Sequence, residues 1–276
     1  MARIDLNSDL GEGWGGVAVA DDAAMLEIVT SANLACGGHG GDADARDAAV
    51  RGALAAGVVI GAHPSYDDRE GFGRRAMDVA GPVLERQVRA QLEALLDTCE
   101  AHGATVSYLK PHGALYSRVL EDADQADAIA RAAAEFSLPV LALAGVSGSA
   151  IQRACDRRFV DVVGEAFADR AYAPDGTLVP RGVDGAVVHG VAAVAARAVR
   201  LARDGVIDTI DGGTVRVSAR SVCVHGDTPG SVAIAGAVRA ALEQAVARTM
   251  VSPYWTRADP AARSVSCPWI AWSASR

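Results

Sequence analysis

The sequence predicts an α/β protein folded as an irregular, seven-stranded parallel β/α barrel. Short apolar runs alternate with amphipathic segments about seven times along the chain, which is typical of a parallel sheet with helical crossovers. Polar residues follow many different runs, as they do at a barrel mouth, and this favours a closed sheet. No linker rich in proline, glycine and serine divides the chain before residue 250. We therefore expect one barrel domain over residues 1–250 and a C-terminal extension over residues 251–276, whose order and role the sequence leaves open.

The candidate strands are short and rich in β-branched or small apolar residues. They span residues 3–6, 32–35, 58–62, 105–109, 140–144, 160–163 and 221–224. The pair Asp211-Gly212 indicates a hairpin turn between two further runs, at 206–210 and 214–217. Strands that alternate with helices in this way favour crossovers on the outside of the sheet.

The helices have recognisable ends. Asp42 is a candidate N-cap for a helix that runs to Gly57, and Pro82 suits the first turn of a long helix that stops at Gly103. Four more helices are expected at 122–136, 148–156, 191–204 and 230–248.

Composition excludes several classes of partner. The net charge is -8, whereas a nucleic-acid partner requires a basic face, so we expect none. No run approaches the length of a transmembrane span, and Arg3, Asp5 and Asp9 interrupt the N-terminus before a secretory signal could form. The five cysteines are widely spaced without a CxxC pair, so neither a disulfide framework nor a zinc ribbon is indicated. We expect a cytoplasmic protein.

A glycine-rich segment at 11–16 fits the GxGxxG pattern of dinucleotide sites. A lone match is weak, and the next helix begins only near Asp21, so the loop itself does not open a helix. Glu12 would also place a carboxylate among the amides meant for pyrophosphate. A loop at the barrel mouth fits this segment better, and a Walker A loop is absent.

Ionisable and amide side chains gather after the candidate strands, where a barrel places its active site. In chain order they are Asn7, Asp9 and Glu12; Asn33, Cys36, His39 and Asp42; His63 and Asp67; Lys110 and His112; Glu165, Asp169 and Arg170; His225 and Asp227. Asp9, His39 and His63 could converge on one divalent ion, Mg or Zn, although each also has an ordinary hydrogen-bonding role. Cys36 is a weaker candidate nucleophile, because a small cysteine at a strand end usually packs.

Lys110 is the single lysine among 26 basic residues. An ammonium differs from a guanidinium wherever a site must hold one oxygen or transfer a proton. Pro111 helps to keep Lys110 extended, so Lys110 and His112 should point to the same side. A cation beside a neutral imidazole suits a developing oxyanion and a proton transfer.

The chain resembles the LamB/YcsF family. The resemblance rests on motifs at residues 5–12, 31–39, 61–64, 71–75, 110–116 (KPHGALY), 165–172 and 224–230, and it covers residues 2 to about 248 in order. Ser8, Trp14 and Ser65 stand where the family commonly has other residues, and none of these departures removes an ionisable group. Members of the family look like irregular seven-stranded β/α barrels related to glycoside hydrolase and deacetylase barrels.

The resemblance implies opening of the 5-oxoproline lactam to L-glutamate, driven by ATP and requiring two partner subunits, B and C. It suggests that Lys110 holds an oxyanion or phosphate and that His112 transfers a proton, with Asp9 and Glu12 beside them. It further suggests a set of substrate-binding or ATP-binding residues: Asn7, Asn33, His39, Asp42, His63, Arg74, Glu165, Arg170, His225 and Asp227. Two alternatives stay open at this point. They are a stand-alone, metal-dependent deacetylase-like hydrolase and a non-catalytic, ligand-binding subunit.

Overall fold

The computed structural model describes residues 2–227, 230–245 and 249–251. Most of the expected C-terminal extension, with Trp255, Trp269 and Trp272, lies outside these described residues.

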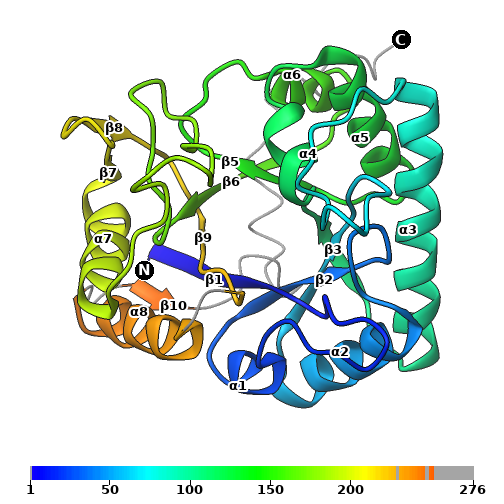
Figure 1. Ribbon diagram of the computed structural model, residues 1–276, viewed down its shortest axis with the longest axis horizontal. Helices are drawn as coiled ribbons and strands as arrows, with labels where there is room; N and C mark the ends of the chain where they lie inside the picture. Colours follow the sequence, from blue (N-terminus) through cyan, green and yellow to red (C-terminus); the bar gives the residue numbers. More distant parts are fainter. Residues whose placement is uncertain (1, 228–229, 246–248, 252–276) are drawn as a thin grey trace, which may run out of the picture.

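Among the described residues, seven parallel strands close into a barrel, as the sequence predicts (Figure 1). The neighbours run β1 (Ala2–Leu10), β2 (Ser31–Ala35), β3 (Val59–His63), β4 (Val106–Leu109), β5 (Val140–Leu143), β6 (Val162–Phe167) and β9 (Ser221–Cys223). β9 also pairs with β1, for example Leu6 with Val222, and this pairing closes the ring. Closure brings the carboxyl ends of all seven strands to one rim.

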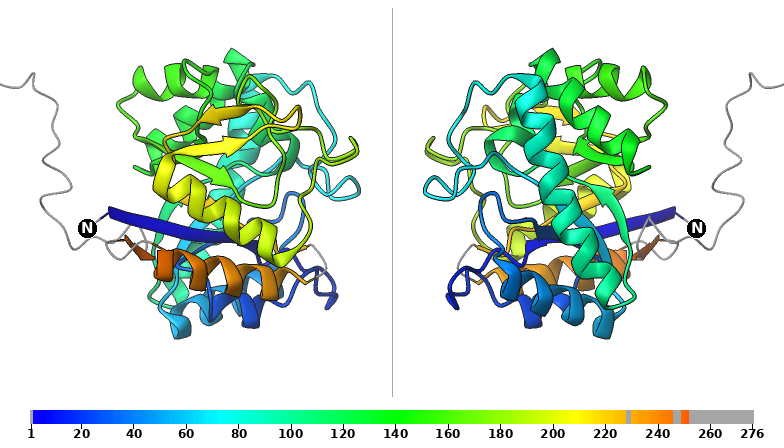
Figure 2. Two further views of the ribbon diagram at one scale, coloured as in Figure 1. Left: turned by 90° about the vertical axis from the view of Figure 1, so that its left-hand side faces the viewer. Right: turned by 90° about the vertical axis from the view of Figure 1, so that its right-hand side faces the viewer.

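Helices cover the outside of the barrel, and both side views show them around the strands (Figure 2). They are α2 (Ala43–Ala56), α3 (Gly81–Ala101), α5 (Ala123–Glu135), α6 (Ala150–Asp156), α7 (Val191–Asp204) and α8 (Ser231–Ala245). Asp42 caps α2 by accepting from the amide of Ala45, and Gly57 ends the helix in the left-handed conformation. Pro82 lies in the first turn of α3. The predicted helix positions are thus confirmed to within a few residues, and residues 246–248 of the last predicted helix lie outside the described residues.

Two strands reach further than predicted, and this changes where the polar residues lie. β1 continues to Leu10, so Asp5, Asn7 and Asp9 lie within the strand at a spacing of two and share its inner face. β6 starts two residues later than predicted and extends to Phe167, which places Glu165 inside it. Polar side chains inside these two strands interrupt the apolar pattern on which the prediction rests. The sequence therefore predicts the first strand as shorter, and the second as shorter and displaced, compared with the structure. The inner face of the barrel is therefore polar and buried.

Short elements complete the chain. α1 (Asp22–Leu26) begins after the glycine-rich loop and is capped by Asp21, and α4 (Gly113–Arg118) follows His112. The predicted hairpin is present as β7 (Val206–Asp208) and β8 (Thr214–Arg216), and β10 (Thr249–Val251) pairs with the start of β1. In the loop itself, Gly11 and Gly15 donate their amides to Asp22 and Asp42, so these amides already hold carboxylates rather than pyrophosphate.

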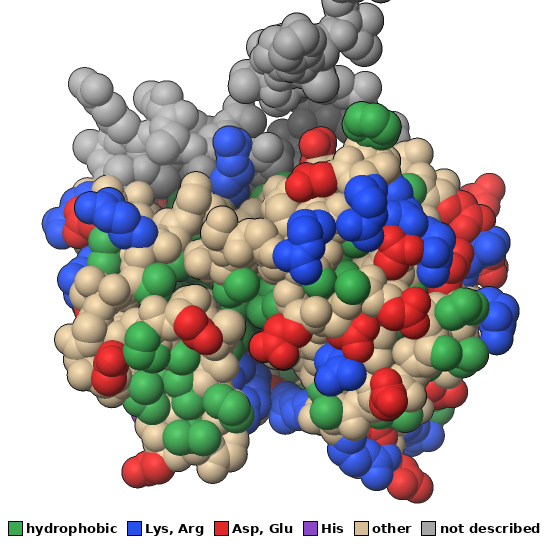
Figure 3. Space-filling model, turned by 90° about the horizontal axis from the view of Figure 1, so that it is seen from above, with side chains coloured by type: hydrophobic (Ala, Val, Ile, Leu, Met, Phe, Trp, Pro, Cys, Tyr) green, Lys and Arg blue, Asp and Glu red, His purple; other side chains and the backbone are tan. Residues whose placement is uncertain are grey.

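The visible surface is mixed in charge. On the face in Figure 3, basic and acidic side chains lie side by side instead of forming a continuous basic surface. Within the described part of the chain, no helix combines the length and apolar character needed to cross a membrane.

Candidate functional site

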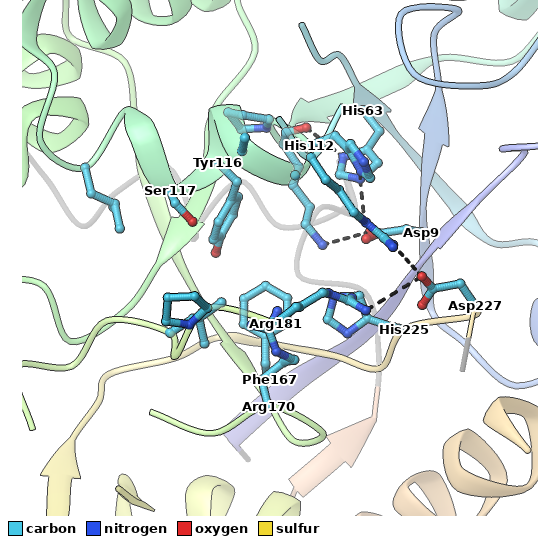
Figure 4. A pocket seen from close by; sticks show the side chains of 18 of the residues that line it. Asp9, His63, His112, Tyr116, Ser117, Phe167, Arg170, Arg181, His225 and Asp227 are labelled. Carbon is cyan, nitrogen blue, oxygen red and sulfur yellow. Dashed lines mark hydrogen bonds and ion pairs between the residues drawn. The ribbon is translucent and has the colours of Figure 1, made fainter. Parts of the chain in front are cut away.

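A pocket of about 500 Å³ opens at the carboxyl ends of the barrel strands. His63 and His112 lie on one side of it and Phe167 and His225 on the other, with Asp9 between them (Figure 4). The volume is in the range of small-molecule sites, and polar groups from five different strands or strand ends converge here. The pocket is therefore the candidate active site.

Lys110 lies at the floor of this pocket and is 2% exposed. Its ammonium is 2.8 Å from Asp9 Oδ1 and 3.0 Å from Glu165 Oε1, and 3.4 Å from Cys223 Sγ. Burial alone would lower the pKa of Lys110, but the neighbouring groups, chiefly Asp9, Cys223 and Glu165, together outweigh it and raise that pKa well above its ordinary value. Burial likewise opposes ionisation of Asp9, yet His63 and Lys110 hold the pKa of Asp9 well below its ordinary value. Lys110 and Asp9 are a buried ion pair.

Two asparagines fix this ion pair from beneath. Asn33 donates to Asp9 Oδ1 and to Asn7 Oδ1, each at 2.7 Å, and Asn7 donates to Glu165 Oε1 at 2.9 Å. Tyr108 donates to Asn33 at 2.6 Å. Its ring crosses Gly61 so closely that a Cβ there would lie 2.1 Å from a ring carbon, so only glycine fits. The network holds the carboxylates in one geometry.

Glu165 has a third partner, Tyr116, on the pocket side. Tyr116 donates to Glu165 Oε2 at 2.8 Å, and burial raises the pKa of the Tyr116 hydroxyl well above its ordinary value. Tyr116 therefore stays protonated and remains a hydrogen-bond donor at neutral pH.

Four buried side chains form what we call the histidine cluster: Glu12, His39, His63 and His112. His39 Nε2 lies 3.0 Å from Glu12 Oε1, and His112 Nδ1 lies 3.0 Å from His63 Nε2. The rings of His39 and His112 stack with centroids 3.6 Å apart. Burial, helped by the neighbouring histidines, lowers the pKa of His112 well below its ordinary value, and burial also lowers that of His39.

The outer nitrogens of two of these rings bind backbone carbonyls. His63 Nδ1 is 2.8 Å from the carbonyl oxygen of Lys110, and His112 Nε2 is 2.9 Å from that of Phe72. A carbonyl oxygen can only accept, so each of these nitrogens carries the hydrogen. The backbone of residues 110–112 also explains how these rings are oriented. The amides of Lys110 and His112 donate to the carbonyl oxygens of Ala62 and Pro64, so this segment runs beside the end of β3.

A second polar pair faces the cluster across the pocket. His225 Nδ1 lies 2.9 Å from Asp169 Oδ2, and its ring stacks on Phe167 with centroids 5.3 Å apart. Burial of Asp169 is outweighed by the charge of His225 and its hydrogen bonds, so the pKa of Asp169 is lowered. An acid that holds one imidazole nitrogen in this way leaves the other nitrogen as the reacting atom.

Three arginines lie at the wall and mouth. Arg74 forms an ion pair with Asp227, which Arg181 also approaches at 3.7 Å. Arg170 binds the carbonyl oxygens of Val179 and Ala186, and burial together with Arg181 lowers its pKa to about 10. The mouth is thus the cationic part of the pocket.

The structure places most of the predicted site residues in or directly beneath the pocket. Asp9, Glu12, His63, Arg74, Lys110, His112, Arg170, His225 and Asp227 line it, and Asn7, Asn33, His39 and Glu165 support it from the buried side. Asp42 does not line it, because its carboxylate caps α2 and binds the amide of Gly15.

Two further interpretations from the sequence concern a metal and a nucleophile. Of the predicted metal set, Asp9 Oδ2 lies 3.4 Å from His63 Nε2, while Asp9 Oδ1 binds Lys110 and Asn33. His39 and His63 form a group with Glu12 and His112. Cys36 donates to the carbonyl of Leu34, and burial raises the pKa of its thiol to about 12, so it packs as a thiol.

Three residues of the site were not predicted as site residues: Tyr116 and Arg181 line the pocket, and Asp169 binds His225, which lines it. Tyr116 lies within the KPHGALY motif, where its neighbours gave the only signal. Asp169 was recognised at a strand end but without a partner, and its contact with His225 spans 56 positions in the sequence. Arg181 comes from an irregular segment between β6 and α7 that has no periodic pattern.

Known proteins share both the sequence and the fold. The LamB/YcsF family profile matches residues 4–254. A 5-oxoprolinase A subunit of Agrobacterium fabrum is 49% identical over 88% of this chain and 95% of that protein. The 5-oxoprolinase A subunit of Paracidovorax citrulli is 52% identical over 88% and 96%. The lactam utilization protein from Thermus thermophilus is 39% identical to this chain in sequence. Its crystal structure superimposes with a TM-score of 0.84 and covers 91% of this chain and 99% of that one. This chain belongs to the LamB/YcsF family.

Proposed function

We propose that this chain is the A component of an ATP-dependent 5-oxoprolinase, which works in the cytoplasm with subunits B and C and converts 5-oxoproline to L-glutamate. The similarity to the named 5-oxoprolinase A subunits, at about half of all positions and nearly full length, carries the proposal. The pocket suits a small substrate, since it holds ionisable groups at its floor and arginines at its mouth.

The reaction needs ATP because a five-membered lactam resists hydrolysis. Transfer of the γ-phosphoryl group to the lactam carbonyl oxygen turns that oxygen into a leaving group. Water then adds to the ring carbon, the ring C–N bond breaks, and the nitrogen takes up a proton to become an amine, which leaves a γ-glutamyl phosphate. A second water hydrolyses this acyl phosphate to L-glutamate and phosphate, and ADP remains. The protein must therefore stabilise charge on oxygen and move protons.

Lys110 is the group that stabilises the oxygen. An ammonium has three N–H donors, and its close contacts to Asp9 and Glu165 use two of them. The third is left with only the longer contacts to Asn7 and Cys223, at 3.5 and 3.4 Å. A developing oxyanion or a phosphate oxygen would be a stronger acceptor.

The proton-transfer role falls to a different histidine from the one the sequence suggests. His112 uses Nε2 for the carbonyl of Phe72 and turns Nδ1 toward His63, so it has no nitrogen for substrate in this arrangement. His225 is held at Nδ1 by Asp169 and can present Nε2 to the pocket. We assign the proton transfer to His225 and the positioning of the floor to His112.

The arginines at the mouth would hold the anionic parts of the ligands. Arg74 and Arg181 both approach Asp227, and exchange of that carboxylate for a phosphate or the substrate carboxylate keeps their charges paired. Arg170, tied to two carbonyls, shapes this wall.

A stand-alone, metal-dependent hydrolase is the second candidate function, and the histidine cluster is the observation that favours it. A non-catalytic, ligand-binding subunit is the third. One reconstitution separates them: L-glutamate and phosphate are measured with the chain alone, with subunits B and C alone, and with all three, each with and without ATP. Our proposal requires that turnover appear only with all three subunits and ATP. Lactam opening by the chain alone without ATP favours the second candidate. Turnover that needs the chain but survives Lys110→Arg and His225→Gln favours the third.

A further inference from the structure

The contact between His63 and His112 cannot be a hydrogen bond between two neutral rings. A neutral imidazole has one N–H, and each ring donates it to a backbone carbonyl, His63 from Nδ1 and His112 from Nε2. The two remaining nitrogens, His63 Nε2 and His112 Nδ1, then carry lone pairs, and they face each other at 3.0 Å. Two lone pairs at this distance repel, so something positive belongs between them.

We propose that Glu12, His39, His63 and His112 bind one divalent transition-metal cation of the zinc type. One donor atom from each of the four residues lies within 4.8 Å of the others. A tetrahedral shell with Zn–N bonds of about 2.0–2.1 Å would place its donors about 3.3 Å apart. The contacts of 3.0 Å within each pair and 3.6 Å between His112 Nδ1 and Glu12 Oε1 are close to that spacing.

The outer contacts of these rings are those of metal ligands. A ligating histidine usually donates its other N–H to a carbonyl or carboxylate, which fixes the ring and its tautomer. His63 and His112 do so through Lys110 and Phe72.

The charge at the pocket floor also favours a cation. Three carboxyl groups, Asp9, Glu12 and Glu165, are buried there, and Lys110 is the cation that contacts two of them, Asp9 and Glu165. Glu12 contacts histidines instead. A buried carboxylate without a positive partner is costly, and a divalent ion would supply that partner.

Donor type selects the class of metal. Three imidazoles and one carboxylate suit Zn²⁺ or a similar transition metal, whereas Mg²⁺ prefers oxygen ligands and water. A second group, Asp9, Cys223 and His225, is also within reach of a common point. The ammonium of Lys110 lies 2.8 Å from Asp9 and 3.4 Å from Cys223, so that position already holds a cation.

Metal binding is independent of the reaction proposed above and is tested without activity. The full chain, purified without a metal-chelating tag, is treated with EDTA and then dialysed against Zn²⁺ or Co²⁺. Bound metal is measured by mass spectrometry, and the Co²⁺ form is examined for the visible bands of a four-coordinate site. Wild type should bind about one equivalent. Glu12→Gln and His39→Gln should weaken binding at least about tenfold. His225→Gln, in the same pocket, is the matched control and should retain the metal.

Three outcomes would overturn the proposal. They are a wild-type chain that stays metal-free after dialysis, unchanged Zn²⁺ content in Glu12→Gln and His39→Gln, and loss of metal in His225→Gln, which would assign the ion to the second group. Circular dichroism shows whether each variant is folded, so a loss of metal that follows from poor folding is recognised. The wild-type Co²⁺ spectrum tests the proposal without any variant. In a metal-free protein, nitrogen NMR would instead show His63 or His112 doubly protonated, with the extra hydrogen between the two rings.

Discussion

Replacing Lys110 with methionine should destabilise the fold as well as stop catalysis, because Lys110 is the counter-ion of buried carboxylates. Methionine has a similar length and no charge, so the change removes the ammonium and keeps the packing beside Phe167. At an effective dielectric constant of about 20, the contacts to Asp9 and Glu165 are each worth about 6 kcal/mol of attraction. Desolvation of the buried ions offsets several kcal/mol, and we expect a net loss of about 3–5 kcal/mol at pH 7.

The loss should depend on pH in a defined direction. In the wild type the pKa of Asp9 is held well below its ordinary value, so its favourable contribution persists until the pH falls below about 4. Without Lys110 the buried Asp9 carboxyl holds its proton more tightly in the folded state than in the unfolded state. The penalty should therefore shrink as the pH falls from 7 to 5, by up to about 1.4 kcal/mol per pH unit.

Urea unfolding, followed by circular dichroism, measures these free energies. Glu165→Gln in the Lys110→Met background removes one uncompensated charge and should recover about 1–3 kcal/mol. Arg51→Met, which breaks an exposed ion pair with Asp47, is the control and should leave the free energy of unfolding nearly unchanged. A Lys110→Met protein within about 1 kcal/mol of wild type, or a further loss on adding Glu165→Gln, would refute the counter-ion role.

Two other predictions concern the site and the outer layer. Gly73 has a φ of +63°, and a Cβ there would lie 2.9 Å from His112 Cδ2, so Gly73→Ala should lower reconstituted turnover about 10–100-fold. Gly103→Ala, with a similar φ and nothing within 4 Å of its Cβ, should leave turnover unchanged, and equal losses in both would show that backbone strain alone acts. Asp127, although burial opposes its ionisation, has its pKa lowered by Arg157, Arg158 and Arg131, so Asp127→Asn should cost about 1 kcal/mol at pH 7. That difference in urea unfolding should persist down to about pH 4 and vanish below it, and a constant difference would contradict the assignment.

The outer layer could be predicted from the sequence because local residues determine it. Asp42 and Asp122 cap their helices through neighbouring amides, and Gly57 supplies a left-handed end, so three residues mark two helices without tertiary information. Closure of the barrel was also predictable, because polar groups recurred near one end of strand after strand.

The inner layer could be predicted less well from the sequence, because its contacts join residues far apart in the chain. Asn7 and Glu165 meet across 158 positions, and neither their hydrogen bond nor the true extent of β6 follows from periodicity. The role of His112 is one that the sequence does not determine. Its motif indicated a catalytic group, but only the carbonyl of Phe72, on another loop, shows that its Nε2 is occupied.

Turnover by the Lys110→Arg variant in the complex with subunits B and C tests the central claim most directly. The guanidinium keeps the positive charge but cannot reproduce a compact ammonium between Asp9 and Glu165. We predict that ATP-dependent formation of L-glutamate falls at least about 100-fold, while circular dichroism shows a folded barrel. Near-normal turnover by the folded variant would contradict the account.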